Sequence, residues 1–138
     1  GENYDEIWTL SPCSPLLIVD DLKNASKVSK KNKKKITLAV TRSNIPIHWA
    51  LQKDKKNNLK PIFKKKLFQR SQDFKKTFFD AGAFAIFPKK FLIKNIKNLE
   101  NMFVGFILPS ERSVDIDDIE SWKFAEYLYK ANIVKKKN

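Results

Sequence analysis

The sequence predicts an α/β fold with a parallel sheet, because its first forty residues follow the order strand, helix, strand. Residues 5–10 form a short, mostly apolar segment suited to a buried strand. Residues 21–31 then carry apolar side chains at the spacing of one helical face. Residues 36–41 are rich in β-branched side chains, which favour a strand. A strand–helix–strand unit of this kind places both strands parallel in one sheet.

The remaining elements follow from local signals. Asp20 is suited to cap the first helix, because a short acidic side chain often precedes a helical segment. Gly82 can adopt a positive φ and so let the chain turn into the strand that follows it. In chain order, the sequence predicts strands at 47–51, 59–63, 83–87 and 103–108, a turn at 53–58, a short helix at 88–92 and a long helix at 119–132.

Two acidic residues alternate with apolar ones in Val-Asp-Ile-Asp-Asp, residues 114–118. In an extended strand, Asp115 and Asp117 would share a face and start about 6.6 Å apart. Two carboxylates at this spacing can converge on one hard cation, which prefers oxygen ligands. A second interpretation is structural, because Asp117 and Glu120 have the spacing of a helix capping box. The residues alone leave the metal site and the cap both open.

Composition narrows the class of protein. The chain has 138 residues, the size of one domain, and 42% of them are hydrophobic, which is enough for a core. No run of 18 apolar residues is present, so we expect no membrane partner. A single cysteine, Cys13, cannot form an intramolecular disulfide and fits a cytoplasmic setting. A single histidine, His48, argues against a histidine-based metal site or a Ser-His-Asp triad.

The net charge of +13 raises the question of nucleic-acid binding. Three of the 28 basic residues are arginine, the residue that dominates base and phosphate recognition. The lysines lie in runs with asparagine and few aromatic residues between them, as on a solvated surface. We therefore expect no nucleic-acid partner, and a small anionic substrate would use few of these charges.

Four short motifs occur in a fixed order along the chain. They are Thr-Leu-Ser-Pro-Cys-Ser-Pro-Leu at 9–16, Arg-Ser-Gln-Asp at 70–73, Asp-Ala-Gly-Ala-Phe at 80–84 and Val-Asp-Ile-Asp at 114–117. Together they resemble the acylneuraminate cytidylyltransferases, the family of the CMP-sialic acid synthetases, and the middle two are most similar to its pseudaminic acid members. The resemblance covers nearly the whole chain. It implies part of a nucleotide-diphospho-sugar transferase fold, which is Rossmann-like.

This resemblance also implies a reaction. The family joins CMP from CTP to a nonulosonic acid, a nine-carbon 2-keto sugar acid, and releases pyrophosphate. Its Mg²⁺-binding, catalytic aspartate pair matches Asp115 and Asp117. Its carboxylate-binding arginine, donated by the neighbouring subunit, matches Arg70, and a guanidinium suits bidentate binding of a carboxylate. The aromatic residue that packs on the sugar matches Phe84.

Two further positions are carried over as substrate-binding residues. Ser11 occupies a place where the family often has glutamine, and Gln72 lies in the same Arg-Ser-Gln-Asp motif as Arg70. His48 falls near a basic residue that, in the family, reaches across the dimer.

Residues 42–79 are predicted to form a dimerisation arm within a single 1–138 α/β domain. This stretch has a large apolar content for a segment without a long helix, namely Ile45, Ile47, Trp49, Leu51, Ile62, Phe63, Leu67, Phe68, Phe78 and Phe79. Exposed on a monomer, these side chains would form a patch of the kind that marks an interface. The resemblance implies a homodimer in which the arm crosses to the partner, so that Arg70 lies nearer the partner's Asp115 than its own.

The chain departs from the family at the phosphate-binding loop. The resemblance implies a glycine-containing basic loop after the first strand of the enzyme, where backbone amides cradle the CTP phosphates. The three glycines of this chain, Gly1, Gly82 and Gly105, do not form such a loop. We therefore expect the 138 residues to be the carboxy-terminal portion, without the nucleotide-binding segment, and to be inactive alone. The alternative is a non-catalytic relative that dimerises or binds ligand.

Overall fold

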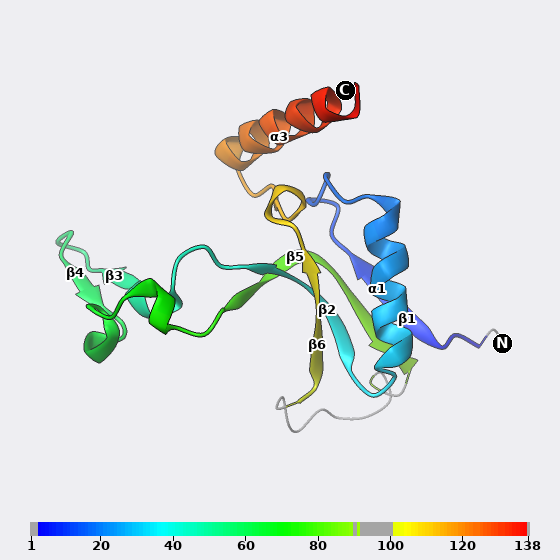
Figure 1. Ribbon diagram of the computed structural model, residues 1–138, viewed down its shortest axis with the longest axis horizontal. Helices are drawn as coiled ribbons and strands as arrows, with labels where there is room; N and C mark the ends of the chain where they lie inside the picture. The colour runs from blue at the N-terminus through cyan, green and yellow to red at the C-terminus, as the bar shows by residue number, and fades with distance from the viewer. Residues whose placement is uncertain (1–2, 90, 92–100, 138) are drawn as a thin grey trace. The chain divides into compact units, whose positions relative to one another are not determined.

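The computed structural model of the chain describes residues 3–89, 91 and 101–137 (Figure 1). The chain forms two compact units. The first unit combines the residues up to Thr41 with those from Asp80 onward, and the second is Arg42–Phe79. The second unit has the bounds of the predicted arm, and its role in dimerisation stays a prediction.

The first unit is built on a sheet with helices. Its helices and strands are β1 (Glu6–Leu10), α1 (Val19–Lys31), β2 (Ile36–Arg42), β5 (Phe78–Pro88), β6 (Phe103–Leu108) and α3 (Ile119–Lys137). In the part of the chain that the structure describes, four strands form this sheet in the order β1-β5-β2-β6. Of the helix expected at 88–92, Pro88 instead ends β5, Lys89 and Phe91 are helical, and residues 90 and 92 lie outside the described residues.

The sheet is mixed, so the prediction of a parallel sheet was wrong in part. Strands β2 and β6 are parallel, with Ile36 opposite Phe103 and Thr41 opposite Leu108. Strands β1 and β5 are antiparallel, with Glu6 opposite Pro88. The first two strands of the chain do belong to one sheet, but β5 lies between them. Periodicity in the first forty residues could not reveal this arrangement, because β5 lies about forty residues later in the sequence.

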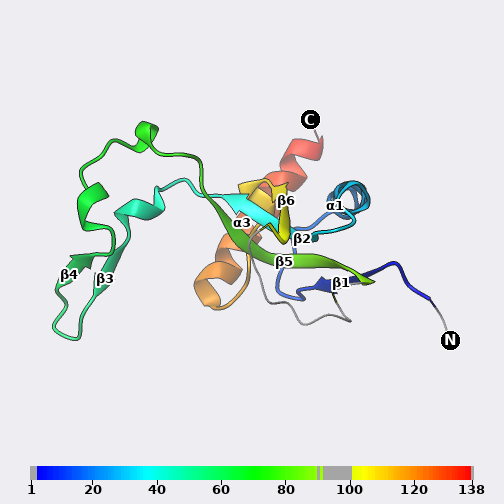
Figure 2. The ribbon, with the colours of Figure 1, turned by 90° about the horizontal axis from the view of Figure 1, so that it is seen from below.

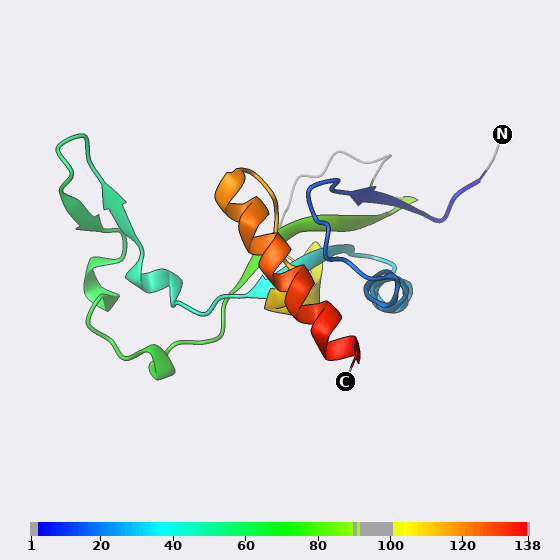
Figure 3. The same cartoon turned by 90° about the horizontal axis from the view of Figure 1, so that it is seen from above.

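Helix α1 lies along one face of this sheet, as Figure 2 and Figure 3 show from opposite sides. The main core cluster between them includes Ala25 of α1, Ala39 of β2 and Ile86 of β5, all fully buried. A second cluster joins Leu16, Val114 and Ala125 of α3. Burial of these apolar side chains is the main stabilising term of the first unit.

Helix α1 begins without the predicted cap. Asp20 lies inside the helix, and the N-cap position is Ile18, which has no side-chain acceptor. The carboxylate of Asp21 instead accepts a hydrogen bond from the Ile18 backbone N–H at 3.2 Å. The acidic residue at the third helical position therefore accepts a hydrogen bond from the backbone N–H of the N-cap residue, which has no partner within the helix.

The second unit contains a short hairpin and three single 3₁₀ turns. Strands β3 (Leu51–Lys53) and β4 (Leu59–Pro61) pair antiparallel, and the turns are Ile47–Trp49, Lys64–Lys66 and Ser71–Asp73. The predicted strand at 47–51 is therefore mostly a 3₁₀ turn. His48 stacks on Phe74 with ring centroids 4.4 Å apart and meets Phe63 edge-on. No residue of Arg42–Phe79, a stretch described throughout, is buried.

Among the described residues, no helix combines the length and the apolar character that a bilayer crossing requires.

Candidate active site

A shallow hollow of about 290 Å³ lies in the first unit, between the end of β1 and the start of β5. Its walls include Ser11, Asp80, Gly82 and Phe84, so it brings together residues of two predicted motifs that lie seventy positions apart. A larger hollow of about 690 Å³ is lined by Asn3, Tyr4, Asp5, Glu6, Ser29, Lys30, Lys33 and Pro88, and it contains none of the predicted site residues.

Gly82 connects this hollow to the acidic motif. Its φ of +63° lies in the left-handed region, which favours glycine. A Cβ at this position would lie 2.6 Å from Oδ2 of Asp115, so the missing side chain makes room for that carboxylate. Asp80 holds the turn, because its Oδ1 accepts a hydrogen bond from the Gly82 N–H at 3.0 Å. The Asp-Ala-Gly motif thus places Asp115 beside the hollow.

The Val-Asp-Ile-Asp segment is irregular and does not form the predicted strand. Its apolar residues still point inward, since Val114 is buried and Ile116 packs against the same cluster. The Ile116 N–H donates to the carbonyl of Cys13 at 3.0 Å, which fixes the segment beside the Ser-Pro-Cys-Ser-Pro turn. Asp115 is half-buried and Asp117 is exposed. One backbone hydrogen bond to a turn therefore replaces the ladder that a strand would need.

The cap of α3 lies one residue later than predicted. Asp118, and not Asp117, precedes the helix, and its Oδ1 accepts from the Ser121 N–H at 2.8 Å. Ser121 Oγ accepts in return from the backbone N–H of Asp118 at 2.9 Å and of Asp117 at 3.1 Å. The bonds from Ser121 hold the pKa of Asp118 below its ordinary value. The interpretation of Asp117 and Glu120 as a capping box was therefore wrong.

The carboxylates of Asp115 and Asp117 are oxygen ligands of the kind that a hard cation prefers. Within the part of the chain that the structure describes, no hydrogen bond or ion pair occupies the carboxylate of Asp115 or Asp117, while Asp118 is committed to the cap. No group of three or more His, Cys, Asp or Glu side chains gathers among the described residues. Magnesium fits such a pair, because it often keeps several waters and binds through one or two carboxylates plus substrate phosphates.

Arg70 and Gln72 lie in the second unit. The Arg70 guanidinium approaches both oxygens of the Asp73 carboxylate, at 3.4 and 3.5 Å, and its side chain is exposed. Gln72 lines a hollow of about 230 Å³ together with Arg42, Ser43, Asn44, Pro46, Ser71, Phe74, Lys75, Lys76 and Thr77. The substrate-binding roles of Arg70 and Gln72 stay predictions.

Phe84 and Ser11 both have structural contacts. The Phe84 ring is 4% exposed and packs between Trp8 and Phe106, with ring centroids 5.7 and 5.9 Å away. Ser11 Oγ accepts from the Cys13 N–H at 3.1 Å, which tightens the turn after β1. Both residues still line the hollow, so their binding roles stay predictions beside these contacts.

Sequence reasoning passed over one ion pair close to this site. Arg112 donates to both oxygens of Asp21, from Nε and Nη2, each at 2.9 Å. The sequence did contain a signal, because arginine is rare in this lysine-rich chain. Arg112 is one of its three arginines, as is Arg70. A spacing of 91 residues concealed the partner.

Comparison with known proteins adds the family. No family model matches the chain. The chain is 33% identical over 129 residues, 94% of its length, to the pseudaminic acid cytidylyltransferase of Campylobacter jejuni serotype O:2. It is 32% identical over the same length to the enzyme of that name from serotype O:23/36. The chain is a relative of the acylneuraminate cytidylyltransferases. It spans 56% of the length of both matched relatives.

Proposed function

We propose that this chain is the sugar-, metal- and dimer-side portion of a cytidylyltransferase that joins CMP from CTP to a nonulosonic acid of the pseudaminic type. The observation that carries the proposal is that Ser11, Asp80 and Gly82 line one hollow and that the carboxylate of Asp115 lies against Gly82. These residues come from three separate motifs of the family resemblance. The names of the two matched relatives supply the reaction and the sugar.

In this proposal the fold is part of a nucleotide-diphospho-sugar transferase fold, and Asp115 and Asp117 hold Mg²⁺. The ion would offset negative charge on the CTP phosphates, and the protein would mostly position the reactants. Ser11 and Phe84 border the sugar site. Gln72 and Arg70 come from the arm of a homodimer, and Arg70 would pair with the sugar carboxylate in bidentate fashion.

The experiment measures pyrophosphate release from CTP and pseudaminic acid by the longest product that the gene encodes. We expect turnover that requires Mg²⁺ and is lost in Asp115→Asn, because one carboxylate ligand is removed. We expect Asp117→Asn to weaken Mg²⁺ binding or turnover while leaving the melting temperature unchanged, because Asp118 caps α3. Asp118→Asn is the matched control, since asparagine also caps well and the residue is not a proposed ligand.

The alternative is a relative that binds or dimerises without catalysis. It predicts that the product binds pseudaminic acid but releases no pyrophosphate with any divalent cation. Turnover by the product that is unchanged in Asp115→Asn would contradict both interpretations.

A further inference from the structure

The ion pair between Arg112 and Asp21 is built with more precision than an ordinary surface pair. The guanidinium meets both carboxylate oxygens at 2.9 Å, and the Asp21 side chain is 5% exposed. Asp21 Oδ2 also accepts from the Ile18 N–H, so three donors satisfy this buried carboxylate. The hydrogen bond to Asp21 raises the pKa of Arg112 above its ordinary value. Such a fork fixes direction as well as distance.

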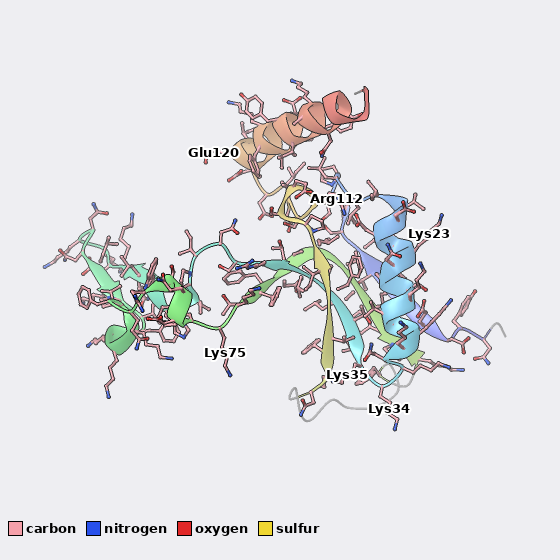
Figure 4. All side chains as sticks on the ribbon, viewed as in Figure 1. Lys23, Lys34, Lys35, Lys75, Arg112 and Glu120 are labelled. Atoms are coloured by element: carbon pink, nitrogen blue, oxygen red, sulfur yellow. The ribbon has the colours of Figure 1, made fainter. Side chains whose placement is uncertain are left out.

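The pair sits where the acidic motif leaves the sheet. Arg112 ends the 3₁₀ turn Ser110–Arg112, which one residue, Pro109, separates from the end of β6. Arg112 lies three residues before Asp115. Figure 4 labels Arg112 beside the amino-terminal part of α1, the helix that carries Asp21. The ion pair therefore connects the end of this turn to α1, and the segment that carries Asp115 begins directly after it.

The three residues from Val114 to Ile116, which follow Arg112 in the chain, make further contacts. Val114 is buried, Asp115 fits into the space left by Gly82, and Ile116 bonds to Cys13. These contacts hold a segment that has no sheet ladder of its own. A shift of the turn at Arg112 would move these contacts, because only Ser113 lies between Arg112 and the first of them, Val114.

Stability alone does not account for an arginine at this place. Replacing a buried ion pair by apolar residues of similar volume is often neutral or stabilising, because desolvation offsets the attraction between the charges. A bidentate pair adds what an apolar contact lacks, which is a defined orientation.

We propose that Arg112 and Asp21 are positioning residues that fix the segment carrying Asp115 and Asp117. The inference rests on the proposed metal role of these carboxylates for its functional meaning, and its first test does not need the metal.

The test compares the double variant Asp21→Leu/Arg112→Met with the unaltered chain. This variant removes both charges and should keep the fold. We expect hydrogen exchange at the Ile116 amide, followed by NMR, to become about tenfold faster through local opening, while the amide of buried Ile86 is unchanged. Exchange at Ile116 that stays unchanged in the folded double variant would overturn the proposal. If that variant does not fold, Arg112→Lys takes its place, since it keeps the charge and loses the fork.

The second readout is Mn²⁺ affinity, with Mn²⁺ as the probe for the magnesium site. We expect the double variant to bind Mn²⁺ about tenfold more weakly, as when the residues that orient metal ligands are removed. Lys23→Met is the matched control, because Lys23 forms an exposed pair with Asp20 on the same helix and should change neither readout. If the unaltered chain binds no Mn²⁺ through Asp115, the proposed metal role fails, and the exchange rate of Ile116 still decides the positioning role.

Discussion

The two units of this chain use apolar residues in different ways. In the first unit, side chains from α1, β2, β5 and β6 form buried clusters around residues such as Ala39 and Ile86. The second unit also has many large apolar residues, yet none of its residues is buried, and Phe68 is 94% exposed. Its internal contacts include a short hairpin, single turns and the ring stack of His48 on Phe74.

This difference shows that apolar content alone does not tell where burial takes place. The first unit resolves its apolar surface within one chain, because strands distant in sequence meet in one sheet. The second unit leaves side chains such as Ile45 and Ile62 exposed in a single chain. An exposed apolar surface of this kind marks an interaction site, and burial against a second copy would remove the exposure.

The largest effect is expected from the core of the first unit. Ile86→Ala removes a fully buried side chain and should lower the free energy of unfolding by about 2–5 kcal/mol, because it leaves a cavity. Leu59→Ala, the matched change at an exposed position of the second unit, should lower it by less than about 0.5 kcal/mol in the monomer. Urea unfolding of dilute protein measures both. Equal losses would mean that the two units share one core.

The next effect concerns the dimer proposed for the second unit. Phe68→Gln should raise the dissociation constant of a homodimer by at least about tenfold, because burial of such a side chain contributes about 1.5–3 kcal/mol and 1.4 kcal/mol is a factor of ten. Light scattering after size-exclusion chromatography over a range of concentrations measures it. Tyr127→Gln, at an exposed aromatic position on α3, is the control and should have no effect. A protein that stays monomeric at every concentration would contradict the proposed dimer.

The sequence predicted most of the first unit because local signals and tertiary contacts agree there. The strand at 36–41 and the helix that begins near 119 are present, since β-branched content and helical spacing match their surroundings. The sequence wrongly predicted that the first two strands are neighbours in a parallel sheet. Strand β5, which follows the arm in the sequence, lies between them. Choices between neighbouring residues also failed, because caps depend on single hydrogen bonds, such as the one from Ser121 to Asp118.

The candidate site was predictable as motifs but not as geometry. Asp115 was expected to act through a strand face, yet its place depends on the positive φ of Gly82 and on the turn that Asp80 holds. The contribution of Arg112 depends on a partner 91 residues away. The Gly82–Asp115 and Arg112–Asp21 contacts both join residues that are far apart in the sequence, so neither produces a periodic pattern from which it could be predicted.

A smaller effect separates the site from the core within the first unit. Gly82→Ala should lower the free energy of unfolding by about 1–2 kcal/mol, because an L-residue is disfavoured in the left-handed region. It should also displace the Asp115 carboxylate and weaken Mn²⁺ binding. Gly105→Ala is the control, since its added Cβ would meet only the Val40 side chain, at 3.0 Å, without a positive φ. Calorimetric melting and Mn²⁺ titration follow both changes, and equal results at the two glycines would refute this account of Gly82.

The smallest effect compares one carboxylate with a lowered pKa from each unit. Asp54 accepts hydrogen bonds from the N–H groups of Lys56 and Asn58, each at 2.9 Å, and the bonds from Asn58 lead the lowering of its pKa. Asp118 has a lowered pKa for the same reason, through Ser121. A folded-state pKa below the unfolded value, about 3.9 for Asp, gives stability that is present above that value. This stability is lost as the pH falls through the folded pKa.

Acid should therefore loosen both turns below about pH 4, but with different consequences. In the second unit the Asp54 turn is a large part of the hydrogen-bonded structure, so amide exchange should rise along the whole β3–β4 hairpin. In the first unit exchange should rise only at the start of α3, because buried Ala125 still anchors the helix. Asp54→Asn should remove the acid dependence of the hairpin, since an amide oxygen accepts without titrating. If exchange rises only at the residues of the Asp54 turn and not along the β3–β4 hairpin, contacts other than this turn must stabilise the hairpin, and this comparison of the two units is wrong.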